Sequence, residues 1–407
     1  MNCRFCGHAL KIEFADLGFS PPSNSFLNKD ELRESEKVYP LKTMVCDQCF
    51  LVQIDEHKKS DEIFNSEYVY FSSFSSSWLS HTKQYVDMIT ERLQLNETSQ
   101  VVEVASNDGY LLQYFKQKNI PVLGIEPTAN TAKAAQEKGI KTLVEFFGAS
   151  LAEKLSATLQ ADLLLGNNVL AHVPDINDFV EGMRILLSPA GVITMEFPHL
   201  MQLIDKNQFD TIYHEHFSYL SLTTVEQIFK AHELVIFDVE EISTHGGSLR
   251  IYAKHIENKN LPISVNVQGL LDKENAFGIK DINTYKRFQA KAEKVRNDFV
   301  SFLKKAGSEN KKVAGYGAAA KGNTLLNFAG VKKDSILFVA DASPYKQGKF
   351  LPGSKIPVVN EQVLKDERPD YVIILPWNLK DEIAAQLDYI KDWGGKFIIA
   401  VPELQIF

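Results

Sequence analysis

The fold class is decided by residues 101–112, which read Val-Val-Glu-Val-Ala-Ser-Asn-Asp-Gly-Tyr-Leu-Leu. A short β-branched run breaks at small polar residues and passes into a helical pattern, as in the first strand, turn and helix of a parallel sheet. Further strand patterns at 122–125, 142–147 and 161–168 alternate with helical stretches. This alternation predicts a doubly wound α/β domain.

The turn after the first strand indicates the cofactor. Ala105 and Ser106 stand where the dinucleotide fingerprint has glycines, which argues against NAD at this turn. Glu126 ends the second strand about twenty residues further on, where a carboxylate can accept hydroxyl groups of a ribose. The acidic strand and the Asn-Asp-Gly turn at 107–109 resemble the first motif of class I S-adenosylmethionine-dependent methyltransferases. The expected cofactor contacts are Glu103, Ser106, Asn107, Asp108, Gly109, Glu126, Asn168 and His172.

A run of titratable side chains at 213–219 is the expected catalytic segment. It holds two imidazoles, one carboxylate and two phenols, which are Tyr213, His214, Glu215, His216 and Tyr219. The run follows a buried strand pattern at 192–198, and catalytic groups of α/β enzymes collect outside the carboxyl ends of such strands. If the segment is extended, His214 points away from its neighbours, so we expect it to be structural.

Four cysteines near the N-terminus predict a zinc site. Cys3 and Cys6 form one C-x-x-C pair, and Cys46 and Cys49 form a second. In a reducing compartment, two such pairs indicate a closed tetrahedral four-thiolate site rather than disulfides. Because no coordination position stays open, we expect the zinc to be structural and to hold together about sixty residues.

Two segments are further candidates for ligand contacts. Residues 67–78 are rich in aromatic and hydroxyl side chains and lead into an amphipathic helix at 78–95. They suit either a core that covers the next domain or a lid over a polyhydroxylated ligand. Residues 244–248 lie between two antiparallel-looking strands and contain His245 and two glycines, which let the backbone approach a ligand.

The last hundred residues predict a second α/β unit, which follows a helical pattern at 281–304. Residues 312–323 run from a strand through a Gly-rich turn into a helix. Free backbone N–H groups at the start of that helix, with Lys321 beside them, suit a diphosphate. Further strand patterns lie at 336–341, 371–376 and 397–402.

Together these motifs resemble the sugar C-methyltransferase family of deoxysugar biosynthesis, over essentially the whole chain. The double C-x-x-C is similar to the family's zinc module, residues 103–109 and 213–219 to its methyltransferase core, and residues 315–324 to its sugar-nucleotide domain. The resemblance implies zinc and S-adenosylmethionine as cofactors. It also implies an α/β protein with three parts: a zinc-binding module at 1–65, a class I methyltransferase domain with the aromatic lid at 66–280, and a linker helix with a second Rossmann-like domain at 281–407.

The resemblance further implies a mechanism. His216 would remove the C3 proton of a nucleotide-linked 4-ketosugar, of the dTDP type, and the resulting enolate would attack the sulfonium methyl. Glu215 is expected to orient and tune the imidazole. Tyr213, with Tyr70 or Tyr68 from the lid, is expected to hydrogen-bond the enolate oxygen. The expected substrate contacts are Tyr219, His245, Tyr316, Lys321 and Asn323.

Composition narrows the setting in which the protein works. A chain of 407 residues predicts two or three domains. A net charge of −8 without a basic stripe argues against nucleic acid as a partner. No apolar run reaches about 18 residues, and no signal peptide is visible, so we expect a cytoplasmic protein without a membrane segment. In the absence of a heptad seam we expect a monomer or a weak homodimer.

Two other classes of function stay open at this point. Two Rossmann-like units also fit an NAD(P)-dependent sugar-nucleotide oxidoreductase or epimerase, and Tyr114 and Lys118 have the Tyr-x-x-x-Lys spacing of short-chain reductases. The missing dinucleotide glycines argue against that class. A non-catalytic sugar-nucleotide-binding protein is the third possibility, and the dense titratable cluster at 213–219 argues against it.

Overall fold

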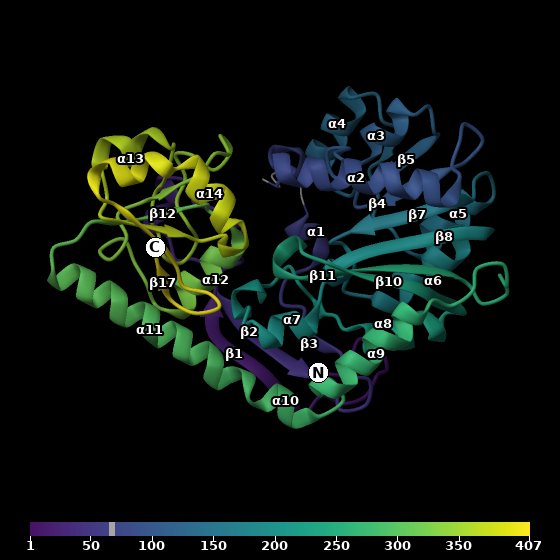
Figure 1. Cartoon of the computed structure of the whole chain (residues 1–407), viewed down its shortest axis with the longest axis horizontal. Coiled ribbons are helices and arrows are strands. Elements are labelled where there is room, and N and C mark those ends of the chain that lie inside the picture. The colour runs from purple at the N-terminus through teal and green to yellow at the C-terminus, as the bar shows by residue number, and fades with distance from the viewer. Residues whose placement is uncertain (65–69) are drawn as a thin grey trace.

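The computed structural model describes residues 1–64 and 70–407, so Tyr68 lies outside the described residues. Figure 1 shows two α/β units side by side, with a small N-terminal sheet below and between them. The long helix α11 (Phe288–Ser308) runs beneath this arrangement and leads into the C-terminal unit. Among the described residues, no helix is both long and apolar enough to cross a membrane.

The central unit is built on a seven-stranded sheet in the order β10-β11-β8-β7-β4-β5-β6. The strands from β4 to β8 are parallel, and the hairpin of β10 and β11 joins them antiparallel to β8. The carboxyl ends of the parallel strands therefore meet at one edge of the sheet. The strands are β4 (Val101–Val104), β5 (Val122–Ile125), β6 (Thr142–Leu143), β7 (Ala161–Asn167), β8 (Leu187–Pro198), β10 (Leu234–Ile242) and β11 (Ser248–His255).

Helices cover both faces of the central sheet because successive strand residues point to opposite faces. Val101 and Leu163 pack in one apolar cluster with α2 and α3, whereas Val102 and Leu164 pack in another with α6, α8 and α9. This double burial explains why the strands read as continuous apolar runs. The helices between residues 76 and 277 are α2 (Ser76–Leu93), α3 (Leu112–Gln117), α4 (Ala129–Glu137), α5 (Ala149–Ser156), α6 (Ile176–Leu186), α7 (Leu200–Asp205), α8 (Leu222–Ala231) and α9 (Val265–Phe277), of which α7 packs instead against the core of the N-terminal sheet.

The N-terminal sheet takes one of its strands from the expected catalytic segment. Its order is β1-β2-β3-β9. The strands are β1 (Ile12–Ser20), β2 (Tyr39–Val45), β3 (Val52–Ile54) and β9 (Ser218–Tyr219). Because β9 begins two residues after His216, the cysteine-bearing module and the catalytic segment share one hydrogen-bonded sheet.

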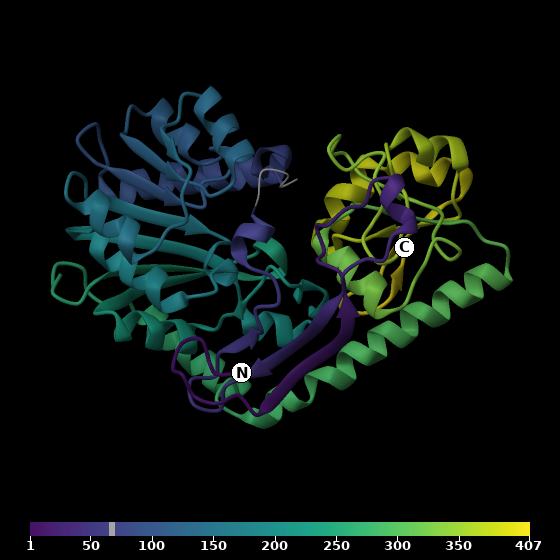
Figure 2. The same ribbon diagram turned by 180° about the vertical axis from the view of Figure 1, so that it is seen from behind.

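The C-terminal unit has a six-stranded sheet in the order β14-β13-β12-β15-β16-β17. All pairs are parallel except the last one, between β16 and β17. Seen from behind, the N-terminal loop that follows β1 lies over this unit (Figure 2), where Leu27 pairs with Phe350. The elements are β12 (Val313–Tyr316), α12 (Ala320–Phe328), β13 (Val339–Ala340), β14 (Val358–Val359), α13 (Gln362–Glu367), β15 (Tyr371–Ile374), α14 (Lys380–Gln386), β16 (Lys396–Ile399) and β17 (Gln405–Ile406).

Several expected elements differ in extent from those observed. The strand expected at 142–147 is limited to the two residues of β6, and the strand expected at 336–341 to the two residues of β13. The helix expected at 281–304 is divided into α10 (Ile282–Lys286) and α11, with Arg287 between them. Tertiary contacts set these limits, since an apolar run keeps strand geometry only where a neighbouring strand pairs with it.

Candidate active site

His216 lies at the end of a tight turn rather than in an extended segment. Its backbone N–H donates to the Tyr213 carbonyl at 2.9 Å. The ring Nδ1 lies 2.9 Å from the Thr211 carbonyl oxygen, and Nε2 lies 2.7 Å from the phenol oxygen of Tyr213. Because a carbonyl oxygen only accepts, Nδ1 carries the ring proton and Nε2 remains as the basic nitrogen.

A second histidine from the central sheet lies against this ring. His172 ends a 3-10 helix after β7, and its ring stands nearly perpendicular to that of His216 with centroids 4.6 Å apart. Burial, and then the charge of His172, lowers the pKa of His216 well below its ordinary value. Burial also lowers the pKa of His172 to about 4. Both imidazoles are therefore uncharged at neutral pH, which leaves His216 able to accept a proton.

The rings of Tyr213 and Tyr219 both lie near the His216 ring. Burial raises the pKa of Tyr213 well above its ordinary value, and Glu215, Tyr219 and Tyr70 add to the effect. Tyr213 therefore stays protonated and donates its O–H to His216 Nε2. The Tyr219 ring lies 6.1 Å from the His216 ring. Its hydroxyl is buried without a hydrogen-bond partner among the described residues.

The two residues inside the turn point away from the His216 ring. Glu215 accepts two hydrogen bonds from the Asn24 side-chain amide, each at 2.8 Å, so the expectation that Glu215 orients the imidazole is wrong. His214 bonds the Pro40 carbonyl at 3.2 Å, away from the other side chains of the run, as expected, although the segment is a turn and not a strand. The turn itself separates the neighbours, since a local reversal redirects successive side chains.

Burial raises the pKa of Glu215 to about 7, against an ordinary value of 4.5. A buried acid with a raised pKa favours the folded protein below pH 4.5, and this contribution is lost as pH rises through about 7. We therefore expect Glu215→Gln to melt progressively higher than the parent between pH 5 and pH 8. The full difference corresponds to about 3 kcal/mol.

The measurement is the melting temperature of both proteins across this pH range. Glu137→Gln changes an exposed glutamate of α4 and serves as the control, for which we expect no such trend. A difference between Glu215→Gln and the parent that does not grow with pH would contradict the raised pKa.

His245 is a further histidine of the candidate site, and a residue just after β7 holds its ring. Asn168 Nδ2 donates to His245 Nε2 at 2.9 Å. Burial lowers the pKa of His245 to about 4, with a further contribution from the charge of Lys321. Gly246 follows with φ of 92°, and a Cβ there would lie 2.5 Å from Trp377 of the C-terminal unit. The glycine therefore permits the close approach of the two units at this point.

Lys321 brings a positive charge from the C-terminal unit to this junction. Its Nζ donates to Asn378 Oδ1 at 2.8 Å and lies 4.7 Å above the Trp377 ring. It lowers the pKa of both His216 and His245, after the larger effect of burial. The diphosphate contact expected for Lys321 stays a prediction.

The hydrogen bonds that join the catalytic turn to the C-terminal unit were not predicted from the sequence. Trp377 Nε1 donates to Asp210 Oδ2 at 2.7 Å, and Thr324 Oγ1 donates to the Ile212 carbonyl at 2.9 Å. Burial raises the pKa of Asp210 to about 6, and nearby Lys321 opposes the rise. An aspartate just before the titratable run was the available signal, but its partner lies 167 positions away.

The other two residues expected from the C-terminal unit make contacts with protein groups. Tyr316 lies at the end of β12, where its hydroxyl accepts from Gln386 at 2.7 Å and donates to Glu361 at 3.4 Å. Asn323 Nδ2 donates to the Ser23 carbonyl at 2.6 Å. Asn323 Oδ1 is buried and finds no partner in the described part of the chain, so it is free to accept from a ligand. Both substrate contacts stay predictions.

The turn after β4 has the geometry of a cofactor loop. Ala105, Asn107 and Gly109 have φ of 56°, 47° and 75°, which coils the backbone tightly. Glu103 is buried at the end of β4, and burial raises its pKa well above its ordinary value. Its carboxylate oxygens find no well-aligned hydrogen-bond partner among the described residues, and the nearby Tyr110 phenol only partly opposes the rise in pKa. A buried, unpartnered carboxylate fits a cationic ligand group, such as the ammonium of S-adenosylmethionine.

Glu126 stabilises the cofactor turn, and its expected contact with the ribose stays a prediction. Its carboxylate accepts from the Asn107 and Thr128 backbone N–H groups, each at 2.9 Å, and from the Thr128 hydroxyl. These bonds fix the cofactor turn to the end of β5. A carboxylate offers about four lone-pair sites, so capacity for ribose hydroxyls remains.

The described part of the aromatic segment, from Tyr70 onward, contacts the cofactor turn, which supports the lid alternative. Ser72 N–H donates to Asn107 Oδ1 at 2.9 Å, and Asn107 Nδ2 donates to the Tyr70 carbonyl at 3.2 Å. The Ser73 hydroxyl bonds the carboxylate of Asp108. The Tyr70 side chain is 46% exposed and lies close enough to Tyr213 to influence its pKa.

Several buried polar atoms without a hydrogen-bond partner among the described residues lie at the ends of β4 and β7, in the loops that follow these strands, and in the 209–219 turn. Native proteins rarely leave such atoms unpaired, so a cluster of them indicates a ligand site. Within residues 1–64 and 70–407 these atoms include Glu103 Oε1 and Oε2, Ser106 Oγ, Asp108 Oδ1, Asn167 Nδ2, Asn168 Oδ1, His172 Nδ1, Asp210 Oδ1 and Tyr219 Oη. The atoms at β4 and β7 lie at the carboxyl ends of neighbouring parallel strands, where ligands bind in this fold.

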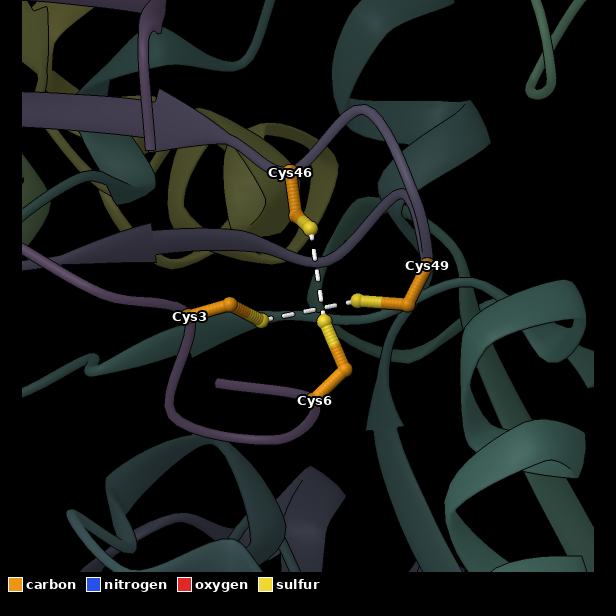
Figure 3. Close-up of side chains that lie close together, drawn as sticks. All are labelled: Cys3, Cys6, Cys46 and Cys49. Carbon is orange, nitrogen blue, oxygen red and sulfur yellow. Dashed lines mark hydrogen bonds between the residues drawn. The ribbon is translucent and has the colours of Figure 1, made fainter. Parts of the chain in front are cut away.

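The four cysteines converge on one point (Figure 3). Their sulfur atoms all lie within 4.8 Å of one another. The Sγ atoms of Cys3 and Cys49 are 3.5 Å apart, and those of Cys6 and Cys46 are 3.6 Å apart. Tetrahedral zinc with Zn–S bonds of about 2.3 Å requires sulfur separations of about 3.8 Å, so the cluster fits the ion.

Each C-x-x-C pair is shaped by the same backbone turn. Gly7 N–H donates to the Cys3 carbonyl at 2.9 Å, and Phe50 N–H donates to the Cys46 carbonyl at 3.0 Å. Gly7 and Phe50 both have positive φ, 74° and 61°. Gln53 Nε2 lies 3.3 Å from Cys3 Sγ and can donate to the thiolate. These groups orient the ligands from outside the metal shell.

Comparison with known proteins covers the whole chain. Residues 3–64 match the family model "Putative zinc binding domain", residues 78–239 match "Methyltransferase domain", and residues 243–402 match "C-methyltransferase C-terminal domain". The chain is 34% identical over 406 residues to C-methyltransferase NovU of Streptomyces niveus, an alignment that covers 100% of this chain and 96% of that protein.

Solved structures resemble the chain over less than half its length. The PH0226 protein of Pyrococcus horikoshii OT3 is 16% identical, with a TM-score of 0.38, over 46% of this chain and 95% of that one. Magnesium protoporphyrin IX methyltransferase of Synechocystis PCC 6803 is 15% identical, with a TM-score of 0.33, over 44% of this chain and 80% of that one.

The similarity to the Streptomyces protein spans both chains almost completely, and the three family matches fall in the order of the three sheets. The oxidoreductase and the non-catalytic alternatives are thereby set aside. S-adenosylmethionine and zinc are the cofactors that these domains bind. The chain belongs to the sugar C-methyltransferase family and is an S-adenosylmethionine-dependent C-methyltransferase.

Proposed function

We propose that this C-methyltransferase acts at C3 of a nucleotide-linked 4-ketosugar, with His216 as the base. The observation that carries the proposal is the tautomer of His216, whose Nδ1 proton is fixed by the Thr211 carbonyl while Nε2 faces the phenol of Tyr213. A neutral imidazole with an unprotonated Nε2 is suited to removing a weakly acidic C–H proton once Tyr213 gives up this nitrogen.

Tyr213 is proposed to exchange partners when the sugar binds. Its O–H donates to His216 Nε2 in the free protein, and it would turn to the 4-oxo oxygen when the C3 proton faces that nitrogen. As Nε2 takes the proton, the C–H electrons move to the oxygen, where a preorganised phenol donor gains strength. S-adenosylmethionine, when bound, supplies an electrophilic methyl group and leaves as S-adenosylhomocysteine.

Glu103 is proposed to hold the ammonium group of the cofactor. Glu103→Gln keeps the shape of the side chain and removes its charge, so we expect affinity for S-adenosylmethionine to fall by about 10- to 100-fold. Calorimetric titration measures the loss. Glu97→Gln, at an exposed position of the same unit, is the matched control and should bind like the parent. Equal affinity for the Glu103 variant would remove this residue from the cofactor site.

The substrate is tested directly with dTDP-4-ketosugars. Calorimetry with S-adenosylmethionine, S-adenosylhomocysteine, NAD and NADP first establishes cofactor preference. Mass spectrometry then detects one added methyl group, and NMR of the product locates it on the ring. Incubation with S-adenosylhomocysteine in deuterated water should wash deuterium into C3, because enolate formation needs no methyl donor. Methylation at another carbon, or no wash-in at C3, would refute the proposed position.

A further inference from the structure

Arg4, between the first two cysteines, contacts three distant segments of the chain through its side chain. Its Nη1 donates to the Pro174 carbonyl and its Nη2 donates to the Ile54 carbonyl, both at 2.6 Å. The guanidinium carbon lies 5.3 Å from the centre of the Phe217 ring. One side chain of the first C-x-x-C turn therefore touches three separate segments of the chain.

Two of these segments carry the histidines of the candidate active site. Pro174 lies two residues after His172, and Phe217 directly follows His216. Ile54, on β3, donates its N–H to the Phe217 carbonyl at 3.1 Å, so it is bound to the same segment from the other side. The Arg4 fork thus ties together the two loops whose imidazoles lie 4.6 Å apart.

The backbone of Arg4 is fixed as firmly as its side chain. Its N–H donates to Gln53 Oε1 at 2.9 Å, and its carbonyl accepts from Asn177 Nδ2 at 3.2 Å. Gln53 in turn lies against Cys3 Sγ, and Asn177 belongs to α6, which begins shortly after Pro174. The cysteine turn, β3 and the start of α6 therefore define where the guanidinium sits.

Arginine is suited to this position for a physical reason. Its planar guanidinium presents donors in a rigid fork and stacks on aromatic rings, whereas a lysine ammonium is a point charge on a flexible stem. Two carbonyl oxygens from different segments, with a phenylalanine ring beside them, match the fork and not the point charge.

We infer that Arg4 is a positioning residue for methyl transfer, which sets the geometry between His172 and His216 from within the zinc module. The inference rests on the proposed role of His216 as the base. Arg4 touches neither imidazole and acts through the Pro174 carbonyl and the Phe217 ring. Misplacement of reacting groups by about 1 Å can cost on the order of 100-fold in rate.

The test compares Arg4→Lys and Arg4→Met with the parent enzyme. We expect kcat to fall about 10- to 100-fold in both, while zinc content and S-adenosylmethionine affinity stay unchanged. Hydrogen exchange at 170–176 and 212–219 should accelerate in both variants. Arg33→Met, at an exposed position of the same module, is the control and should behave like the parent.

The possible outcomes distinguish a positioning role of Arg4 from a role in folding of the zinc module. They also distinguish failure of this inference from failure of the proposed base. If Arg4→Met loses zinc, then kcat and hydrogen exchange of Arg4→Lys, which keeps the charge, show whether Arg4 positions the two loops. An unchanged kcat with unchanged exchange in a zinc-loaded variant overturns the inference. In a His216→Asn background the Arg4 substitution should cause no further loss. If His216→Asn itself is fully active, the proposed base is wrong, yet faster exchange in the Arg4 variants would still show the coupling.

Discussion

Replacement of His216 by asparagine is expected to lower methyl transfer by about two to four orders of magnitude, the range typical of a lost general base. Asparagine can keep a donor toward the Thr211 carbonyl, the partner of His216 Nδ1. It has no nitrogen that accepts a proton at neutral pH. The cofactor turn follows β4 and should be untouched, so S-adenosylmethionine affinity should stay at the parental value.

The neighbouring histidine provides a matched control. His214 differs from His216 by two positions, but its ring bonds the Pro40 carbonyl and packs near Tyr39. His214→Asn should therefore keep turnover within about tenfold of the parent. The measurement is kcat by mass spectrometry, together with calorimetric affinity for the cofactor. A His216 variant with parental turnover, or a His214 variant with the larger loss, would exclude His216 as the base.

Removal of zinc is expected to abolish turnover while cofactor binding survives. Four thiolates hold the module together, and structural zinc contributes several kcal/mol or more of folding free energy. Once the ion leaves, β3 loses its support, and β3 pairs directly with β9 beyond His216. The catalytic turn should then loosen. The cofactor turn is fixed separately by Glu126 and should still bind S-adenosylmethionine.

Cys46→Ser and a chelator are the two routes to this state. Zinc release, hydrogen exchange at 1–64 and 212–219, turnover and cofactor affinity are measured on the same sample. Returning zinc to the chelated parent should restore turnover, and the serine variant should not respond. Retained turnover without zinc would show that the zinc module is not needed to hold the catalytic turn. A loss of cofactor affinity while the fold persists would contradict the structural role of the ion.

The central sheet was predictable because its signals are local. The β-branched run at β4, its polar turn and the carboxylate at the end of β5 lie within 26 residues, and each pattern follows from strand geometry. The four cysteines were equally readable from their spacing. In contrast, β9 has two residues and pairs with a strand about 165 positions earlier, so no window of sequence contains the information.

The same distinction separates right and wrong predictions within the site. Tyr213 and His216 are three positions apart and hydrogen-bond each other, and the family resemblance implied that both belong to the catalytic centre. Glu215 was given the wrong partner because adjacency in sequence suggested contact, whereas the turn sends its carboxylate to Asn24. Trp377 was not predicted because its hydrogen bond to Asp210 joins two units that are 167 positions apart in the sequence.

The turn at 209–219 is held from three directions, which limits how enzymes of this kind can be recombined. The C-terminal unit supplies Thr324 and Trp377, the N-terminal module supplies β3 and Asn24, and the central unit supplies His172. A chimera that exchanges the C-terminal unit alone would also exchange the partners of Ile212 and Asp210. A functional exchange of the C-terminal unit therefore requires the donor's turn to travel with the donor's unit.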